Sequence, residues 1–194
     1  EGGESGAVTR STISGTGGVG ISVFGGSQLT VSDSTIQGTD GGIDGYSSNL
    51  QVLNSTISGG NGPRLYLYDC SGTVEGSTLS QATGAYGDGM ELIGGSVSIL
   101  RNVFENNQRF GLAIYSDTDL SAQGFFARNL IRNNSSSGVY ISNTPAVRLA
   151  ANMILDNSRG VRCAGTTAGV LVNNTIARST SPDLGDGLQV AGTS

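Results

Sequence analysis

The sequence predicts an all-β fold, a right-handed parallel β-helix of about eight coils with three short strands in each coil. Two observations predict this fold class. A short motif recurs every 21–27 residues, and apolar residues keep the same phase with it along the chain. Self-similarity at a period of this length is typical of solenoids. The repeat covers the sequence, so we expect residues 1–194 to form one domain that is a segment of a longer protein.

The recurring motif consists of a polar residue, a variable residue and an apolar residue. The apolar residue of each copy is Ile13, Ile36, Ile57, Leu79, Phe104, Ile131, Ile154 or Ile176. Five positions earlier lies a second apolar column, formed by Val8, Val31, Val52, Val74, Ile99, Phe126, Leu149 and Leu171. Residues five apart on a straight strand face opposite sides, so both columns can face one interior only if the chain bends between them. We therefore expect two strands separated by a tight bend.

A third strand follows each motif after a turn of variable length. It carries two apolar residues spaced by two, which is the period of a strand. The pairs are Ile21/Val23, Ile43/Gly45, Leu65/Leu67, Met90/Leu92, Leu112/Ile114, Val139/Ile141, Val161/Cys163 and Leu188/Val190. Only Gly45 breaks the apolar pattern. We expect stacked coils to pair each strand with its equivalent about 4.8 Å away.

The polar residue of the motif is predicted to be structural. It is Ser in the first four coils and Asn in the last four, at Ser11, Ser34, Ser55, Ser77, Asn102, Asn129, Asn152 and Asn174. Stacking brings these residues together at the bend, where amide side chains can hydrogen-bond along the stack. Asn also tolerates the left-handed backbone that a tight bend needs.

Composition excludes several classes of function. Ten Arg, no Lys and fifteen acidic residues give a formal net charge of −5, which argues against a nucleic-acid partner because such a partner needs a basic face. No apolar run approaches the roughly 20 residues that span a bilayer, so we expect no membrane insertion. Cys70 and Cys163 lie four coils apart, too far for a disulfide, and two cysteines do not make a metal site. We expect no metal and no cofactor.

The motif and the strand that follows it resemble a known repeat. The third strand reads GISV at Gly20, GVYI at Gly138, GVRC at Gly160 and GLQV at Gly187. Together with the Ser/Asn-x-apolar motif, these segments resemble the parallel β-helix repeat of the pectin-lyase-like superfamily over the whole chain. The resemblance implies that the third strands form the sheet that carries the substrate groove. We expect a secreted or cell-surface protein.

The ends of the repeat carry no recognisable cap. A coil begins almost at once, at Val8, and the last strand pair ends at Val190. An open solenoid end recruits other strands. We therefore expect adjoining β-helix coils or domains at both ends.

Outward positions of the third strand form the candidate site. Five of the six tyrosines fall there, namely Tyr46, Tyr66, Tyr68, Tyr115 and Tyr140, and Arg64 and Arg162 lie nearby. Aromatic faces suit sugar rings, and the acids and Arg can bind hydroxyls or uronate carboxylates. We predict that these residues bind a polysaccharide or cell-surface glycan. The alternative is that the tyrosines only stabilise the sheet by stacking on each other.

Three insertions flank this face, over residues 81–87, 116–123 and 178–185. Insertions in repeat proteins often build the binding side. The first two insertions are expected to wall a groove around Tyr66, Tyr68, Glu91 and Tyr115. The alternative is tolerated surface variation.

The sequence leaves catalysis open. Asp44 and Glu91 are equivalent outward acids two coils apart, so about 9.6 Å separates their backbones, near the 6.5–9.5 Å of inverting glycosidases. The segment GTDGGID at Gly38 is similar to the NTDGxD motif of polygalacturonases, with its Asn missing and its spacing changed by one residue. The chain has no His and no Lys, which limits the usual general bases to carboxylates.

We favour glycan binding without catalysis. One alternative is a polysaccharide lyase or glycoside hydrolase that acts on an acidic glycan at the same face, with Asp44 and Glu91 as candidates. Another is a structural stalk or adhesin rod without a small-ligand site. A row of outward threonines on the second strand, from Thr12 to Thr78, also fits ice binding, although it ends at Val103.

Overall fold

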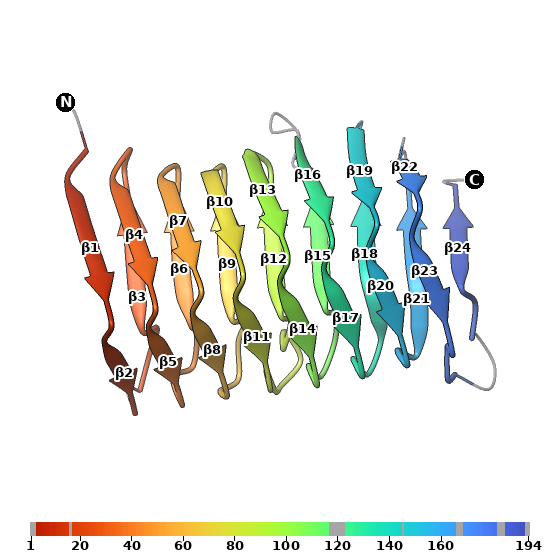
Figure 1. Ribbon diagram of the computed structural model, residues 1–194, viewed down its shortest axis with the longest axis horizontal. Helices are drawn as coiled ribbons and strands as arrows, with labels where there is room; N and C mark the ends of the chain where they lie inside the picture. The colour runs from red at the N-terminus through yellow and green to blue at the C-terminus, as the bar shows by residue number, and fades with distance from the viewer. Residues whose placement is uncertain are drawn as a thin grey trace.

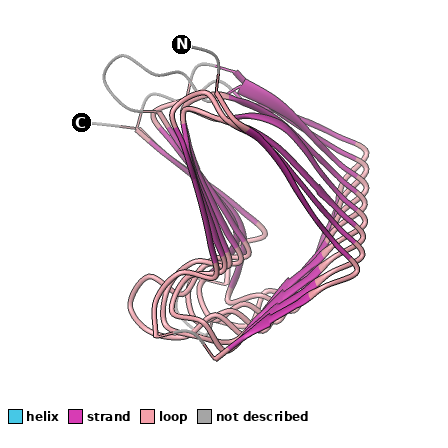
Figure 2. Ribbon diagram, turned by 90° about the vertical axis from the view of Figure 1, so that its left-hand side faces the viewer, coloured by secondary structure: helices cyan, strands magenta, loops and turns pink. Residues whose placement is uncertain are grey.

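The protein is a β-solenoid. The computed structural model describes residues 3–15, 17–116, 123–144, 146–165, 169–181 and 185–192. Within them it contains 24 strands and no helix, arranged in three parallel sheets of eight strands. The coils stack in sequence order along one axis, and a view down that axis shows the three sheets around a common interior (Figures 1 and 2). The predicted parallel solenoid with three strands per coil is confirmed, with about seven turns.

Sheet A consists of the first strand of each coil. Its strands are β1 (Ser5–Thr9), β4 (Gln28–Ser32), β7 (Asn49–Leu53), β10 (Ser71–Glu75), β13 (Ser96–Leu100), β16 (Gln123–Ala127), β19 (Ala146–Ala150) and β22 (Gly169–Val172). Val8 pairs in register with Val31, and Val31 with Val52. The same column continues to Leu171, as the five-residue spacing predicts.

Sheet B carries the recurring motif. Its strands are β2 (Thr12–Ser14), β5 (Thr35–Gln37), β8 (Thr56–Ser58), β11 (Thr78–Ser80), β14 (Val103–Glu105), β17 (Leu130–Arg132), β20 (Met153–Leu155) and β23 (Thr175–Ala177). The central residues of these short strands pair in register from Ile13 to Ile176. They form the second apolar column of the interior.

Sheet C consists of the third strand of each coil. Its strands are β3 (Ile21–Phe24), β6 (Ile43–Tyr46), β9 (Leu65–Tyr68), β12 (Met90–Ile93), β15 (Leu112–Tyr115), β18 (Ser137–Ser142), β21 (Arg159–Ala164) and β24 (Leu188–Ala191). The two apolar positions of each strand point inward, and the positions between and after them point outward. The outer face of sheet C is the predicted candidate face.

The core lies where the three columns meet. Val31, Ile36 and Ile43, one from each sheet, are fully buried. Gly45 interrupts the pattern because its neighbours fill the space: a Cβ there would lie 2.8 Å from Leu50 Cδ1 and 3.0 Å from Cys70 Sγ. Burial of the apolar columns is the main favourable term that holds the coils together.

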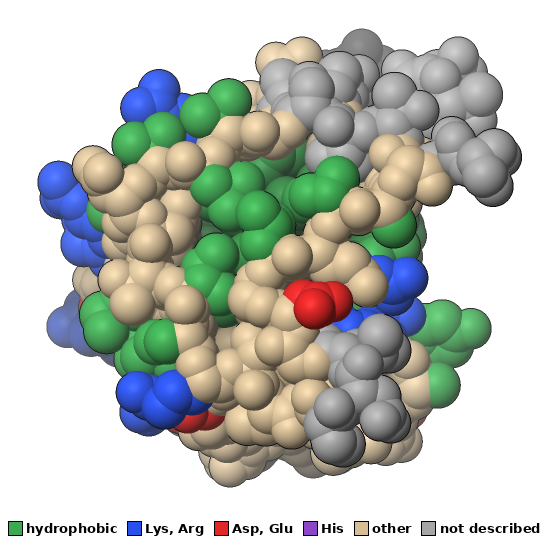
Figure 3. Space-filling view, turned by 90° about the vertical axis from the view of Figure 1, so that its right-hand side faces the viewer, with side chains coloured by type: hydrophobic (Ala, Val, Ile, Leu, Met, Phe, Trp, Pro, Cys, Tyr) green, Lys and Arg blue, Asp and Glu red, His purple; other side chains and the backbone are tan. Residues whose placement is uncertain are grey.

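The two ends of the stack are less covered. Val8, Ile13 and Ile21 of the first coil are only partly buried, and Leu188 and Val190 of the last coil are more than half exposed. Figure 3 looks onto the C-terminal end, where hydrophobic side chains gather over the middle of the coil. The apolar interior therefore continues to the end of the stack, and this geometry fits adjoining coils.

The predicted ladder at the bend between sheets A and B is confirmed. The backbone N–H of Ser77 donates to Asn102 Oδ1 over 2.9 Å. Asn102 Nδ2 donates to Asn129 Oδ1, and Asn129 Nδ2 to Asn152 Oδ1, over 3.2 and 2.9 Å. In the first coils the Ser hydroxyls accept backbone N–H donors in the same way.

The prediction that these Asn residues hold the left-handed backbone is wrong. The residue immediately before the ladder has the positive φ in every coil: Arg10, Asp33, Asn54, Gly76, Arg101, Arg128, Ala151 and Asn173. The ladder side chain must point inward to reach its partners, so the neighbouring residue makes the turn. That neighbour points to solvent, and its identity is therefore variable.

A second ladder, between sheets B and C, was not predicted. Asn107 Nδ2 donates to Asn134 Oδ1 over 3.0 Å, and Asn134 Nδ2 donates to Asn157 Oδ1 over 2.9 Å. The backbone N–H of Ala82 donates to Asn107 Oδ1, which ends the ladder on its N-terminal side. The signal in the sequence is an Asn three positions after the apolar residue of the motif in three successive coils.

Cys70 and Cys163 are both buried free thiols. Cys163 occupies the inward position predicted for it, and Cys70 lies in the hydrophobic core between β9 and β10. In the part of the chain that the structure describes, no helix is long and apolar enough to cross a membrane.

Candidate functional site

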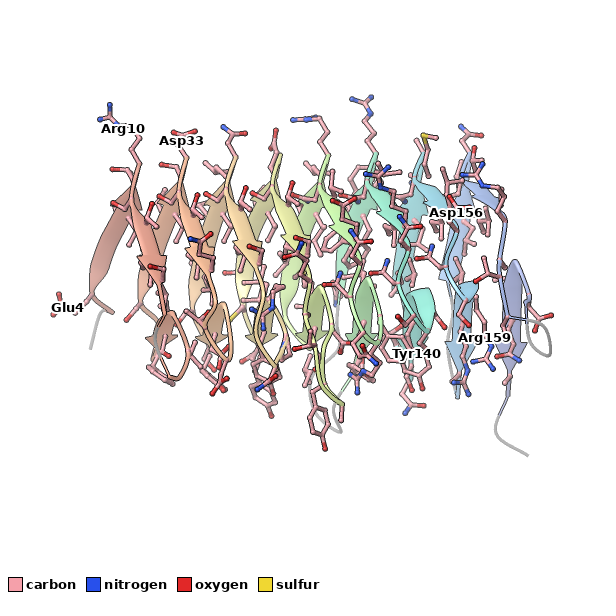
Figure 4. All side chains as sticks on the ribbon, turned by 90° about the horizontal axis from the view of Figure 1, so that it is seen from below. Glu4, Arg10, Asp33, Tyr140, Asp156 and Arg159 are labelled. Carbon is pink, nitrogen blue, oxygen red and sulfur yellow. The ribbon has the colours of Figure 1, made fainter. Side chains whose placement is uncertain are left out.

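A groove of about 580 Å³ lies on the outer face of sheet C, over β6, β9 and β12. It is lined by Val19, Asp40, Gly41, Asp44, Tyr46, Asn61, Gly62, Pro63, Tyr66, Tyr86 and Glu91. The outward residues of the strands form its floor, and the turns between sheets B and C form one wall. Figure 4 shows this side of the stack below, with Tyr140 and Arg159, and the bend with Arg10 and Asp33 on the opposite side.

The strand register places the floor residues as the repeat predicted. Asp44 on β6 pairs with Tyr66 on β9, and Tyr66 pairs with Glu91 on β12. The backbones of Asp44 and Glu91 are therefore about 9.6 Å apart, which is twice the spacing between neighbouring strands. Tyr66 stands between them on the same face. Tyr46 lies on the next outward row, level with Tyr68.

The wall combines a predicted insertion with residues that sequence reasoning missed. Tyr86, from the 81–87 insertion, lines the groove and is 67 % exposed. Asp40 accepts a 3.5 Å hydrogen bond from the Asn61 side-chain amide in the next turn. Of the other predicted insertions, residues 117–122 and 182–184 lie outside the described residues.

Arg64 is not at the surface of the groove. Its side chain is fully buried, and its guanidinium donates to three carbonyl oxygens: Thr39 at 3.3 Å, Asp40 at 2.9 Å and Gly62 at 2.5 Å. The structure therefore does not bring Arg64 to a position where it would touch a ligand. Its contribution to the groove is to fix the turns that form the wall and to place a positive charge beneath Asp44.

Arg64 provides the hydrogen-bond donors in the coils that precede the second Asn ladder. The ladder ends at Ala82, and the guanidinium supplies the donors for the carbonyl groups of the turns before it. The turn at Gly60 is shaped around this side chain. Gly60 has a φ of +104°, and a Cβ there would lie 1.6 Å from Thr39 O and 3.1 Å from Arg64 Nη1. Only glycine fits this position.

A partly buried ion pair lies beside the groove. Asp88 is fully buried and accepts hydrogen bonds from Arg109 Nε at 2.8 Å, from Arg109 Nη2, and from the Phe110 backbone N–H at 2.9 Å. Arg109 Nη2 also lies 3.7 Å from Glu91 Oε2 and donates to the Tyr115 hydroxyl over 3.3 Å. This cluster holds Glu91 in place. Its signal in the sequence is an acid and an Arg one coil apart.

Comparison with known protein families finds a match for this chain. The family described as "Right handed beta helix region" matches residues 1–86 and 65–194. The chain belongs to this family. No curated protein and no solved structure matches the chain. Membership confirms the right-handed parallel β-helix, and because a fold supports many activities, the function of this β-helix has to be argued from its groove.

Burial shifts the pKa values of Asp44 and Glu91 on the floor of the groove of this β-helix. Burial raises the pKa of Asp44 to about 6, although the charge of Arg64 acts in the opposite direction. Burial also raises the pKa of Glu91, with a further increase from Asp88 and an opposing effect of Arg109. The groove therefore holds two partly desolvated carboxyl groups, and Asp44 changes its charge near pH 6.

The phenol of Tyr66 stays protonated at neutral pH. Burial raises its pKa to about 12, and the nearby charge of Glu91 adds to the increase. Tyr66 thus offers a hydroxyl donor and an aromatic face between two carboxyl groups. A sugar ring is a ligand that uses both features.

The tyrosines of the later coils of the β-helix are packed against other side chains. Tyr140 stacks on Phe110 with ring centroids 4.8 Å apart and an interplanar angle of 7°, and the Arg162 guanidinium lies 5.4 Å from its centroid. Tyr115 tilts against Tyr140 at 5.6 Å. None of Tyr115, Tyr140 and Arg162 lines the groove. Here the stacking alternative accounts for the aromatic residues.

Tyr68 is half-buried on the outward row beside Tyr46 and does not line the groove. Within the described residues, no group of three His, Cys, Asp or Glu side chains is arranged to hold a metal ion. The side chains that line the groove offer carboxylates, an amide, aromatic faces and a phenol.

Proposed function

We propose that this β-helix is a secreted or cell-surface module that binds polysaccharide in the groove over β6, β9 and β12, without catalysis. The observation that carries the proposal is the meeting of aromatic residues from separate elements. Tyr66 comes from a strand, and Tyr86 from the 81–87 insertion. Carboxylates and an amide lie around them. Apolar faces with a few polar groups at their edges are what sugar rings need.

Burial does not account for Tyr86, although the Arg109 guanidinium lies 5.7 Å from its ring centroid. A large aromatic side chain that is 67 % exposed on an insertion contributes little burial to the fold, in contrast with Tyr140, which stacks on Phe110. The volume of about 580 Å³ also falls within the roughly 300–1,000 Å³ of ligand pockets. The groove is therefore large enough for a few sugar rings.

The position of Tyr66 argues for binding rather than hydrolysis. A glycosidase needs its two carboxyl groups to flank the scissile bond, with room for a water molecule. In this groove Tyr66 occupies the strand between Asp44 and Glu91, so its side chain fills the space between the two acids. A sugar would rest on the ring, above the line that joins the carboxyl groups.

The test is a glycan array followed by calorimetric titration of the glycans that bind. We expect Tyr66→Ala and Tyr86→Ala each to weaken binding at least about tenfold, as for an aromatic residue at the centre of an interface. The matched control is Phe125→Ala, which removes an exposed aromatic side chain from the outer face of sheet A and should leave affinity unchanged. Binding that survives both tyrosine variants would contradict the proposal.

One observation favours a second candidate, glycoside hydrolysis at the same groove. The pKa of Asp44 is raised to about 6, which is the kind of shift that lets a carboxyl group act as a general acid. We expect no release of reducing ends from any glycan that binds. Release that disappears in both Asp44→Asn and Glu91→Gln would establish the enzyme in place of the binding module.

A further inference from the structure

We infer that the groove selects glycan chains that carry free amino groups, of the polyglucosamine type, over neutral chains and over chains of uronic acids. This inference rests on the proposed function and names the class of sugar that the groove takes. It differs from the expectation from sequence, in which Arg64 and Arg162 would bind uronate carboxylates.

The side chains that line the groove carry negative charge. Among the described residues that line it, Asp40, Asp44 and Glu91 are acidic and none is basic. Two Arg side chains lie close to the groove, and both already have partners; Arg109 is 3.7 Å from Glu91 and 5.7 Å from the Tyr86 ring centroid. Arg64 is buried against carbonyl groups, and Arg109 is bound to Asp88 through two of its nitrogens. A uronate carboxylate in the groove would meet like charges without a free cation.

Asp44 and Glu91, the two acids on the floor of the groove, have few partners within the protein. Among the described side chains, Asp44 has no direct hydrogen-bond or ion-pair partner, and Arg64 offsets its charge only from beneath. Glu91 has Arg109 at 3.7 Å, and that guanidinium is shared with Asp88. An ammonium group of a bound sugar would give each carboxylate a close, charge-assisted hydrogen bond. A neutral sugar would leave Asp44 without a direct partner and Glu91 with only the guanidinium that it shares with Asp88.

Three tyrosines, Tyr46, Tyr66 and Tyr86, also line the groove. Tyr46 and Tyr66 tilt against each other with ring centroids 5.6 Å apart, and Tyr86 rises from the wall. Aromatic faces attract cations as well as sugar rings. Carboxylates and tyrosines in one groove therefore reinforce each other for a ligand that is both a sugar and a cation.

The experiment compares glycans that differ in charge. A glucosamine hexamer, the same hexamer fully N-acetylated, and a galacturonic acid hexamer are each titrated into the protein near neutral pH by calorimetry. We expect the glucosamine hexamer to bind at least about tenfold more tightly than the other two, with an affinity that falls as salt is added. Asp44→Asn should weaken its binding about fivefold or more.

A matched variant separates recognition from bulk charge. Asp33→Asn removes the same single charge from an exposed bend on the opposite side of the stack (Figure 4), and Asn suits its positive φ of 50°. We expect Asp33→Asn to bind like the unmodified protein. An equal loss of affinity in both variants would overturn the inference, because the acids of the groove would then have no special role.

The remaining outcomes distinguish this inference from the proposed function. Tighter binding of the N-acetylated or galacturonic hexamer would overturn the amino-sugar inference, and so would a Tyr66-dependent interaction with some other glycan alone. The proposed function would stand in each of these cases. If the array and all three hexamers give no binding, both proposals fail.

Discussion

The turns between sheets B and C differ between the two halves of the solenoid. In the later coils, Asn107, Asn134 and Asn157 repeat one hydrogen-bonded arrangement. In the earlier coils the ladder is absent and one buried guanidinium, Arg64, satisfies the turn carbonyls. The groove lies only over this second arrangement. Where the Asn ladder is interrupted, the turns between sheets B and C have unequal lengths and form one wall of the groove.

The largest expected effect is on the free energy of unfolding, and it comes from the later coils, which carry the second Asn ladder. Asn134→Leu keeps the branched shape of the side chain and removes the groups that donate to Phe104 O and Asn157 Oδ1 and accept from Asn107. We expect a loss of about 3–5 kcal/mol in the free energy of unfolding, because several buried polar groups lose their partners together. Urea denaturation measures it.

The control for this variant is Asn49→Leu, which removes a hydrogen bond to Ser71 at an exposed site and should cost about 1 kcal/mol or less. Glycan affinity of the folded Asn134→Leu protein should be unchanged. A loss as small as that of the control would mean that the ladder does not hold the coils together.

The next effect is on the irregular half. Arg64→Met keeps the apolar stem and removes the donors to Thr39, Asp40 and Gly62. We expect a loss of about 2–4 kcal/mol in the free energy of unfolding, together with a loss of glycan binding, because the wall of the groove depends on these turns. Denaturation and calorimetric titration measure the two effects.

Arg101→Met is the matched control, since Arg101 pairs with Glu75 at an exposed site and such a pair is worth about 1 kcal/mol or less. If the Arg64→Met protein binds glycans normally, the groove does not depend on the hydrogen bonds of Arg64 to the turn carbonyls.

The sequence predicted the repetitive parts of the molecule and missed the exceptional ones. Val31, Ile36 and Ile43 were assigned to one interior because every coil must bury the same three columns, and a repeat shows that requirement eight times. Arg64 was predicted to bind the ligand because it lies near the outward tyrosines of the third strand. Its burial depends on the missing ladder in neighbouring turns, which no local pattern reveals. Asp88 and Arg109 were missed for the same reason.

The candidate face divides in the same way. The register that sets Tyr66 between Asp44 and Glu91 follows from the repeat. Whether a tyrosine is packed or open depends on particular neighbours, such as Phe110 under Tyr140. That distinction needs side-chain positions in adjacent coils, so sequence alone treated all five tyrosines of the face as equal.

The smallest expected effect concerns the charge of Asp44. Burial raises its pKa from 3.8 to about 6, so the folded chain holds this proton more tightly than the unfolded chain. The stability associated with this group is present below about pH 4 and is lost as the pH rises to about 6. A full shift of this size is worth roughly 3 kcal/mol, and partial solvent exposure reduces the effect to about 1–2 kcal/mol.

Asp44→Asn should therefore be more stable than the unmodified protein at pH 7 and about equal to it below pH 4. Denaturation curves across this range measure the difference. A constant difference at all pH values would contradict the assignment of the effect to ionisation. The exposed variant Asp33→Asn is the control and should show no such trend.

The most direct test of the groove is to find which tyrosines contact a bound glycan. The chain has six tyrosines, and two-dimensional NMR spectra of a sample with 13C-labelled tyrosine rings report on each during a titration with a bound oligosaccharide. We predict shifts at Tyr46, Tyr66 and Tyr86, which line the groove, and none at Tyr115 and Tyr140, which lie outside its lining. Shifts confined to Tyr115 and Tyr140, or spread equally over all six rings, would contradict the groove as the binding site.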